Sequence, residues 1–198
     1  MDTYSIPGNT VCAMLDSVAR VSGPQYRALL TAAGWQQWLT TPPPATWAPV
    51  ARPTDVSRLF TAVYQMLGED LTRLFFTNYG NAMAEQLLAS EAGTELRQAL
   101  ARAPQPAGLA EFLPVFARVQ AQGWGNATLH ETPQAWLMTV EHCPVCSEIR
   151  GARAPVCASG TALMGQMARR LLGRRVRVAE VACVATGDPH CVFAFYKN

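Results

Sequence analysis

Apolar residues recur every three or four positions through the first two-thirds of the chain, a spacing that is typical of helices packed on a core. Residues 9–21 show it clearly, with Val11, Met14, Leu15 and Val18 on one face. The same spacing predicts further helices over residues 24–33, 55–67, 69–88, 94–101 and 107–122. Gly68 separates two of these helices, and Gly80 is small enough to mark a close helix contact.

The pattern changes near residue 125. Residues 126–131 and 135–141 are predicted to be strands, and residues 157–172 a helix with its apolar positions four apart. Residues 176–185 and 191–196 then predict a hairpin around the turn at residues 186–190. Helices followed by strand-strand-helix-strand-strand indicate the α+β class, with an antiparallel sheet in the second part.

The chain is expected to form a single domain over residues 1–198. Residues 1–53 form a helical amino-terminal segment with a Pro-rich connector that includes Pro42, Pro43 and Pro44, and residues 54–198 form the core. The amino-terminal segment is apolar on one face. That face predicts a homodimer surface or, as the alternative, packing on the chain's own core.

Composition narrows the classes of protein. Apolar residues make up 49% of the 198 residues and charged residues 15%, which excludes general disorder. A net charge of +2 gives no support for a nucleic-acid partner. Residues 1–7 lack the pattern of a signal peptide, and no stretch approaches the roughly 18 apolar residues of a membrane span. We therefore expect a cytoplasmic protein with reduced thiols and no membrane span.

Four residues near the end of the chain have the chemistry of a zinc site. Thiolates with one carboxylate satisfy tetrahedral zinc, and Cys157, Glu180, Cys183 and Cys191 supply that set. The hairpin brings Cys183 and Cys191 together, and Cys157 begins a helix, where the dipole favours a thiolate. Glu180 and Cys183 are three residues apart, so a β-bulge or a strand end is needed to place both on one ion. The alternative is that the three cysteines are small buried core residues.

A second pair, Cys143 and Cys146, has the two-residue spacing of redox and metal-binding cysteines. The βαβ context of a thioredoxin is missing, and a metal site here would have to borrow further ligands. Redox exchange and a second metal position both stay open for this pair, and Cys12 is expected to be a helix core residue.

Enzyme motifs are missing from the sequence. It contains no Gly-x-Gly-x-x-Gly dinucleotide loop, no phosphate loop and no nucleophile elbow. A binding protein is therefore favoured over an enzyme.

Residues 178–193, which contain Glu180, Cys183 and Cys191, resemble the signature of the 4-vinyl reductase domain. That family includes bacteriochlorophyll 4-vinyl reductase, archaeal hydrocarbon-binding proteins and the sensing domains of phenol- and xylene-responsive activators. In the sensing members a Cys, a Glu, a Cys and a Cys hold zinc. Cys157, Glu180, Cys183 and Cys191 match those positions with separations of 23, 3 and 8 residues.

The resemblance implies a fold like that of haem-based nitric oxide sensors and transport-particle subunits, built around an apolar pocket. It implies structural zinc and a hydrophobic or aromatic ligand, a tetrapyrrole among the candidates. Trp136 stands where sensing members have a pocket tryptophan, and Phe112, Phe116 and Met138 are assigned to the pocket with it. Those sensors hold the phenol hydroxyl with a His, and residues 105–110 contain none.

The leading hypothesis is a zinc-containing domain that binds a small molecule and acts as a sensor or carrier. One alternative is an accessory or reductase-like protein of (bacterio)chlorophyll vinyl-group reduction. The other is a protein–protein interaction module.

Overall fold

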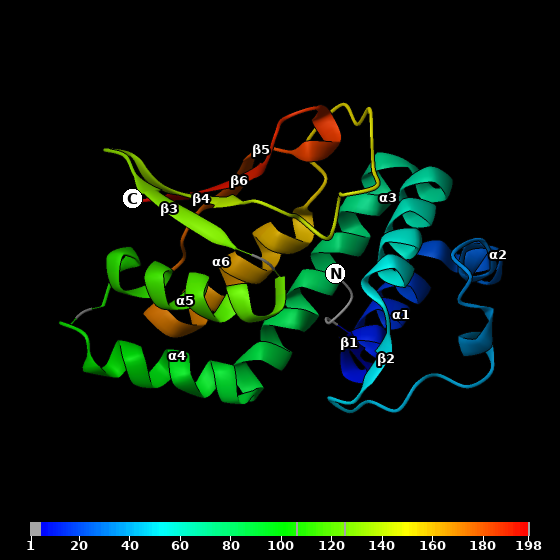
Figure 1. Ribbon diagram of the computed structural model, residues 1–198, viewed down its shortest axis with the longest axis horizontal. Helices are drawn as coiled ribbons and strands as arrows, with labels where there is room; N and C mark the ends of the chain where they lie inside the picture. The colour runs from blue at the N-terminus through cyan, green and yellow to red at the C-terminus, as the bar shows by residue number, and fades with distance from the viewer. Residues whose placement is uncertain (1–4, 106, 125, 198) are drawn as a thin grey trace.

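A four-stranded antiparallel sheet lies against one side of a helical body in the computed structural model (Figure 1). The structure describes residues 5–105, 107–124 and 126–197. Its helices are α1 (Gly8–Ser22), α2 (Tyr26–Ala32), α3 (Pro53–Ala89), α4 (Glu91–Arg102), α5 (Leu109–Trp124) and α6 (Ala158–Leu172). Its strands are β1 (Ile6–Pro7), β2 (Pro49–Ala51), β3 (Ala127–Glu131), β4 (Ala135–Val140), β5 (Val178–Ala182) and β6 (Cys191–Tyr196). The predicted α+β class, helices first, is confirmed.

The main sheet has the strand order β3-β4-β6-β5, with every neighbouring pair antiparallel. The register pairs Met138 with Phe193 and Val140 with Cys191, and each pair is buried on the face that packs toward the helices. α6 packs between this sheet and α3, and α5 packs against β3 (Figure 1). The sheet therefore places the start of β6 beside the start of α6.

Helix α3 is broken in the middle, as the sequence predicts. Gly68 has φ +75°, a left-handed conformation that glycine adopts without a steric penalty, and the helix resumes after it. The second half, which carries Phe75, Phe76 and Tyr79, is the part whose apolar side chains are most deeply buried.

The apolar face of α1 is buried within the chain. Val11, Met14 and Val18 are at most 1% exposed, and α1 packs on α3. The amino-terminal segment thus packs on its own core, and a homodimer, which stays a prediction, would need another surface.

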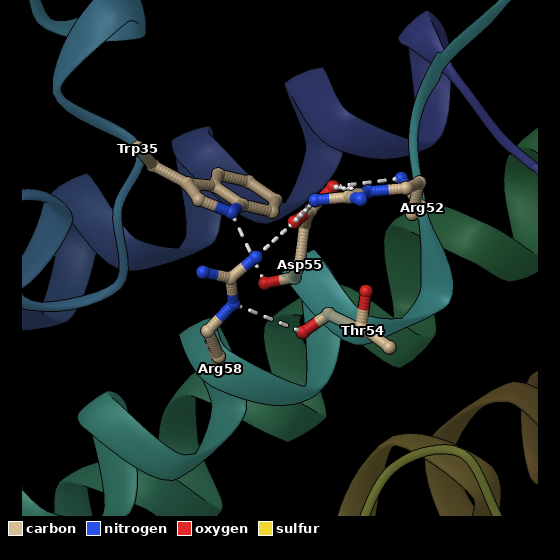
Figure 2. Close-up of polar contacts among 5 residues, drawn as sticks. All are labelled: Trp35, Arg52, Thr54, Asp55 and Arg58. Atoms are coloured by element: carbon tan, nitrogen blue, oxygen red, sulfur yellow. Dashed lines mark hydrogen bonds and ion pairs between the residues drawn. The ribbon is translucent and has the colours of Figure 1, made fainter.

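A polar cluster fixes the junction between the connector and α3 (Figure 2). The Asp55 carboxylate accepts a hydrogen bond from the backbone N–H of Arg52 at 3.0 Å and pairs with the guanidinium groups of Arg52 and Arg58. The indole N–H of Trp35 donates to the backbone carbonyl of Asp55 at 3.1 Å. These contacts anchor the end of the connector to the first turn of α3.

The connector also forms a sheet that the hydrophobic pattern does not predict. β1 pairs with β2, so that Ile6 lies opposite Ala51.

Within the described residues, no helix has both the length and the hydropathy needed to cross a bilayer.

Candidate metal centre and adjoining cavity

The structure brings the four predicted zinc ligands together. Cys157 immediately precedes α6, Glu180 lies in β5, Cys183 follows β5, and Cys191 begins β6. One ligand atom from each of the four lies within 4.8 Å of the others. All three cysteines are fully buried.

A bulge in β5 accounts for the offset of three between Glu180 and Cys183. Glu180 pairs with Phe193 and Ala182 pairs with Val192, so the register shifts and Val181 is the extra residue. Val181 is 51% exposed, whereas Glu180 reaches the cluster. The bulge therefore places Glu180 and Cys183 on the same face, as two residues of a regular strand separated by one would be.

Glu180 is oriented by the start of α6. Its Oε2 accepts a hydrogen bond from the backbone N–H of Cys157 at 2.8 Å, while its Oε1 is buried and has no hydrogen-bond partner. Burial, together with the negative charge of the Cys183 thiolate, raises the pKa of this carboxyl group to about 10. A cation beside Oε1 would satisfy the free oxygen and displace the proton.

The hairpin turn holds Cys183. The Asp188 carboxylate accepts hydrogen bonds from the Cys183 backbone N–H and the Thr186 hydroxyl, both at 2.9 Å. Gly187 completes the turn with φ +103°. Hydrogen bonds from the Cys146 and Cys157 thiols lower the pKa of Cys183 to about 6, which favours the thiolate that a metal requires.

Cys143 and Cys146 join the same cluster. They lie in the loop between β4 and α6, where the Sγ of Cys143 is 3.4 Å from that of Cys157 and the Sγ of Cys146 is 3.3 Å from that of Cys191. Cys143, Cys146, Cys157 and Cys191 therefore form a second set of four ligand atoms within 4.8 Å of one another. The sequence pattern singled out the pair, but its proximity to Cys157 and Cys191 arises only in the folded chain.

The donor types fit a metal ion in either set. Thiolates with one carboxylate, and four thiolates, are both ligand sets of tetrahedral zinc. Either set of four could hold a metal ion. None of the six cysteines forms a disulfide, and Cys12 lies apart, with its Sγ 3.3 Å from the carbonyl oxygen of Pro43.

A small cavity adjoins the cluster and encloses about 20 Å³, the room of one water molecule. Cys143 and Cys157 form part of its wall. Gln120 Oε1 and Ser159 Oγ are buried in residues that line the cavity, and neither atom has a hydrogen-bond partner. The apolar wall includes Tyr79, Met83, Val140, Leu163, Met164 and Phe193.

Residues 136–197, which contain five of the six cysteines and Glu180, match the family model of the 4-vinyl reductase domain. This part of the chain is a 4-vinyl reductase domain. The family resemblance seen in the sequence is thereby confirmed. No curated protein matches the chain.

Solved structures share the fold that surrounds the 4-vinyl reductase region. The phenol-responsive sensory domain of the transcription activator PoxR, solved with phenol, has a TM-score of 0.52 and 15% identity over 88% of this chain and 90% of that one. An H-NOX protein from S. oneidensis in the Fe(II)NO state has a TM-score of 0.50 and 13% identity over 98% of this chain and 100% of that one. At these identities the likeness is one of fold, and it agrees with the fold expected from nitric oxide sensors.

The four residues assigned to the pocket lie near the cavity but not in its wall. Phe112, Phe116 and Met138 are fully buried in the core, and Trp136 is half-buried on β4. Trp136 pairs with Phe195 and Met138 with Phe193, so both occupy the helix-facing side of the sheet. Their role in binding stays a prediction, whereas the lining residues Gln120 and Ser159 were not singled out by any sequence motif.

Proposed function

We propose that this protein is a zinc-containing domain that binds a hydrophobic or aromatic small molecule and acts as a sensor or carrier. The observation that carries the proposal is the apolar cavity beside the cysteine cluster, into which two unpartnered polar groups are placed. The PoxR sensory domain, which shares the fold, was solved with phenol. Residues 54–198 would form the ligand-binding core of a single domain.

Zinc would have a structural role in this domain. Cys157, Glu180, Cys183 and Cys191 supply four protein ligands, which leaves no position for a reacting water. Bound there, the ion would join the final hairpin to the start of α6. Thiolate ligands need reducing conditions, which supports the cytoplasmic location that we propose.

Ligand entry would require the cavity to widen, because about 20 Å³ is too small for an aromatic ring. Met83 and Met164 are unbranched and adapt their shape readily, so they are the wall residues best suited to move. Widening toward α5 and β4 would reach Phe116, Met138 and Trp136. Gln120 and Ser159 could then bind a ligand hydroxyl, the role of the missing His.

The first experiment is native mass spectrometry of protein purified without added ligand, because it reports metal and ligand together. We expect bound zinc and a co-purified small molecule. The Cys183→Ser variant should lose zinc, and Cys12→Ser is the matched control because Cys12 lies outside the cluster. A stable wild-type protein with no metal would refute the zinc assignment.

A second experiment addresses the cavity with phenol and toluene as paired probes. Ser159→Ala removes the buried hydroxyl and should weaken phenol binding about tenfold, the effect of one lost hydrogen bond, without weakening toluene binding. If neither probe binds the wild-type protein, small aromatic molecules are not its ligands.

The small size of the cavity favours one second candidate, a protein–protein interaction module. Leu71 and Leu74 are 40% and 48% exposed on the outer face of α3, and together they offer an apolar contact surface. A homodimer through this surface is the simplest form of that candidate. Light scattering of the wild-type protein and of Leu74→Glu tests it, and a monomer in both cases would exclude self-association.

A further inference from the structure

Six metal-binding side chains gather at one place in the fold. Cys143, Cys146, Cys157 and Cys191 form one set of four, and Cys157, Glu180, Cys183 and Cys191 form the other. The two sets have Cys157 and Cys191 in common, and the Sγ atoms of these two residues are 4.0 Å apart. With metal–thiolate bonds of about 2.3 Å, the sulfur atoms of a tetrahedral site lie roughly 3.8 Å apart. The Cys157–Cys191 pair therefore has the length of a tetrahedron edge.

The other sulfur contacts agree with a tetrahedron on the far side of that edge. Cys143 lies 3.4 Å from Cys157, and Cys146 lies 3.3 Å from Cys191. All four thiols are buried. This half of the cluster needs no ligand from Glu180 or Cys183.

A single tetrahedral ion would leave part of the cluster without a partner. An ion held by the four cysteines leaves the buried Glu180 Oε1 unsatisfied, and an ion held by the Glu180 set leaves Cys143 and Cys146 as spare buried thiols. Two tetrahedral ions that share an edge need six ligands in all, and six are present.

Charge does not oppose the second ion. One divalent ion with four anionic ligands carries two net negative charges, and two divalent ions with six anionic ligands carry the same two. The buried charge is therefore no greater with both positions filled.

We propose that Cys143 and Cys146, with Cys157 and Cys191, form a second, all-thiolate metal position, so that the chain binds two soft divalent ions bridged by Cys157 and Cys191. The proposal rests on the zinc position of the proposed function and extends it. The second position would tie the loop between β4 and α6 to β6, a link that the first ion does not make.

The test is metal stoichiometry in protein loaded with Zn²⁺ under reducing conditions, by native mass spectrometry and elemental analysis. We expect two ions per chain in the wild-type protein and in the Cys12→Ser control. Cys143→Ser/Cys146→Ser and Glu180→Gln/Cys183→Ser should each keep one, because each variant removes the two ligands that only one position uses.

Loading the wild-type protein with ¹¹³Cd²⁺ gives a readout that does not depend on variants that fold. Two ¹¹³Cd resonances coupled to each other would support ions joined through shared thiolates, and a single resonance would overturn the proposal. A wild-type protein that binds one Zn²⁺, and keeps it in Cys143→Ser/Cys146→Ser, would overturn the second position and leave the first. One that survives only Glu180→Gln/Cys183→Ser would overturn both assignments, as would a wild-type protein that binds none.

Discussion

Gly80 of α3 lies directly against the backbone of Ser159 at the start of α6. A Cβ atom at position 80 would overlap the Ser159 carbonyl oxygen and come within 2.8 Å of the Ser159 Cα. The two helices can approach this closely only because residue 80 has no side chain. This contact holds the start of α6, and with it Cys157, at a fixed depth below the sheet.

Gly80→Ala should therefore destabilise the protein. The added methyl group meets backbone, which cannot rotate away, and we expect a loss of about 1–3 kcal/mol in the free energy of unfolding. Gly165→Ala is the control, since its Cβ would have only Val178 Cγ2 near it, at 4.0 Å, and should stabilise α6 by up to about 1 kcal/mol. Urea denaturation of both variants measures the difference, and equal effects would contradict the packing argument.

Asp55 gives a prediction for pH. The side-chain hydrogen bond from Arg52 holds the pKa of the Asp55 carboxyl below its usual value, with Arg58 contributing further. A lowered folded-state pKa adds stability above the unfolded pKa, and this stability is lost as the pH falls through the folded pKa. Asp55→Asn should cost about 1 kcal/mol at pH 7, and the difference from wild type should vanish below about pH 3.

The control for Asp55 is Asp70→Asn. Asp70 is 96% exposed and its ion pair with Arg73 spans 3.8 Å, so its removal should leave stability unchanged at every pH. Thermal unfolding from about pH 2 to about pH 7 tests both variants across the range in which the carboxyl titrates. A pH-independent loss in Asp55→Asn would mean that the carboxylate charge is not what stabilises the junction.

Met164→Ala tests the cavity as a binding site. Met164 lines the cavity and is 1% exposed, so its truncation should enlarge the space and cost about 2–5 kcal/mol of stability. Toluene should bind this variant more tightly than wild type, as calorimetry would detect. Met167→Ala, which is fully buried but does not line the cavity, should lose similar stability without that gain. Equal gains in both variants would show that any new void binds toluene.

Deletion of Val181 tests the role of the bulge. Without the extra residue, Glu180 and Cys183 become two residues apart in a regular strand and stay on the same face. We expect metal content to be retained, as elemental analysis would measure beside the Cys183→Ser variant. A folded deletion variant without metal would mean that the bulge itself shapes the ligand geometry.

Much of the fold could be predicted because its information is local. The spacing of Val11, Met14 and Val18 identifies α1, and the final hairpin follows from its turn residues. Pairing of β1 with β2 could not be predicted, because a two-residue strand such as Ile6–Pro7 has no periodicity and its partner lies far along the chain, at Pro49–Ala51.

The site divides in the same way. Cys157, Glu180, Cys183 and Cys191 could be grouped from their spacing, and the need for a bulge followed from strand geometry. The cavity wall combines residues of α3, α5, α6 and the sheet, so its lining depends on tertiary packing that a linear pattern does not encode.

Cys143 and Cys157 belong to both the cysteine cluster and the cavity wall. A molecule that displaces either side chain changes the affinity of the cluster for metal. Thermodynamic reciprocity then requires the metal to change the affinity for that molecule by the same factor. A domain built in this way responds to the combination of metal supply and ligand supply, and neither signal can be read independently of the other.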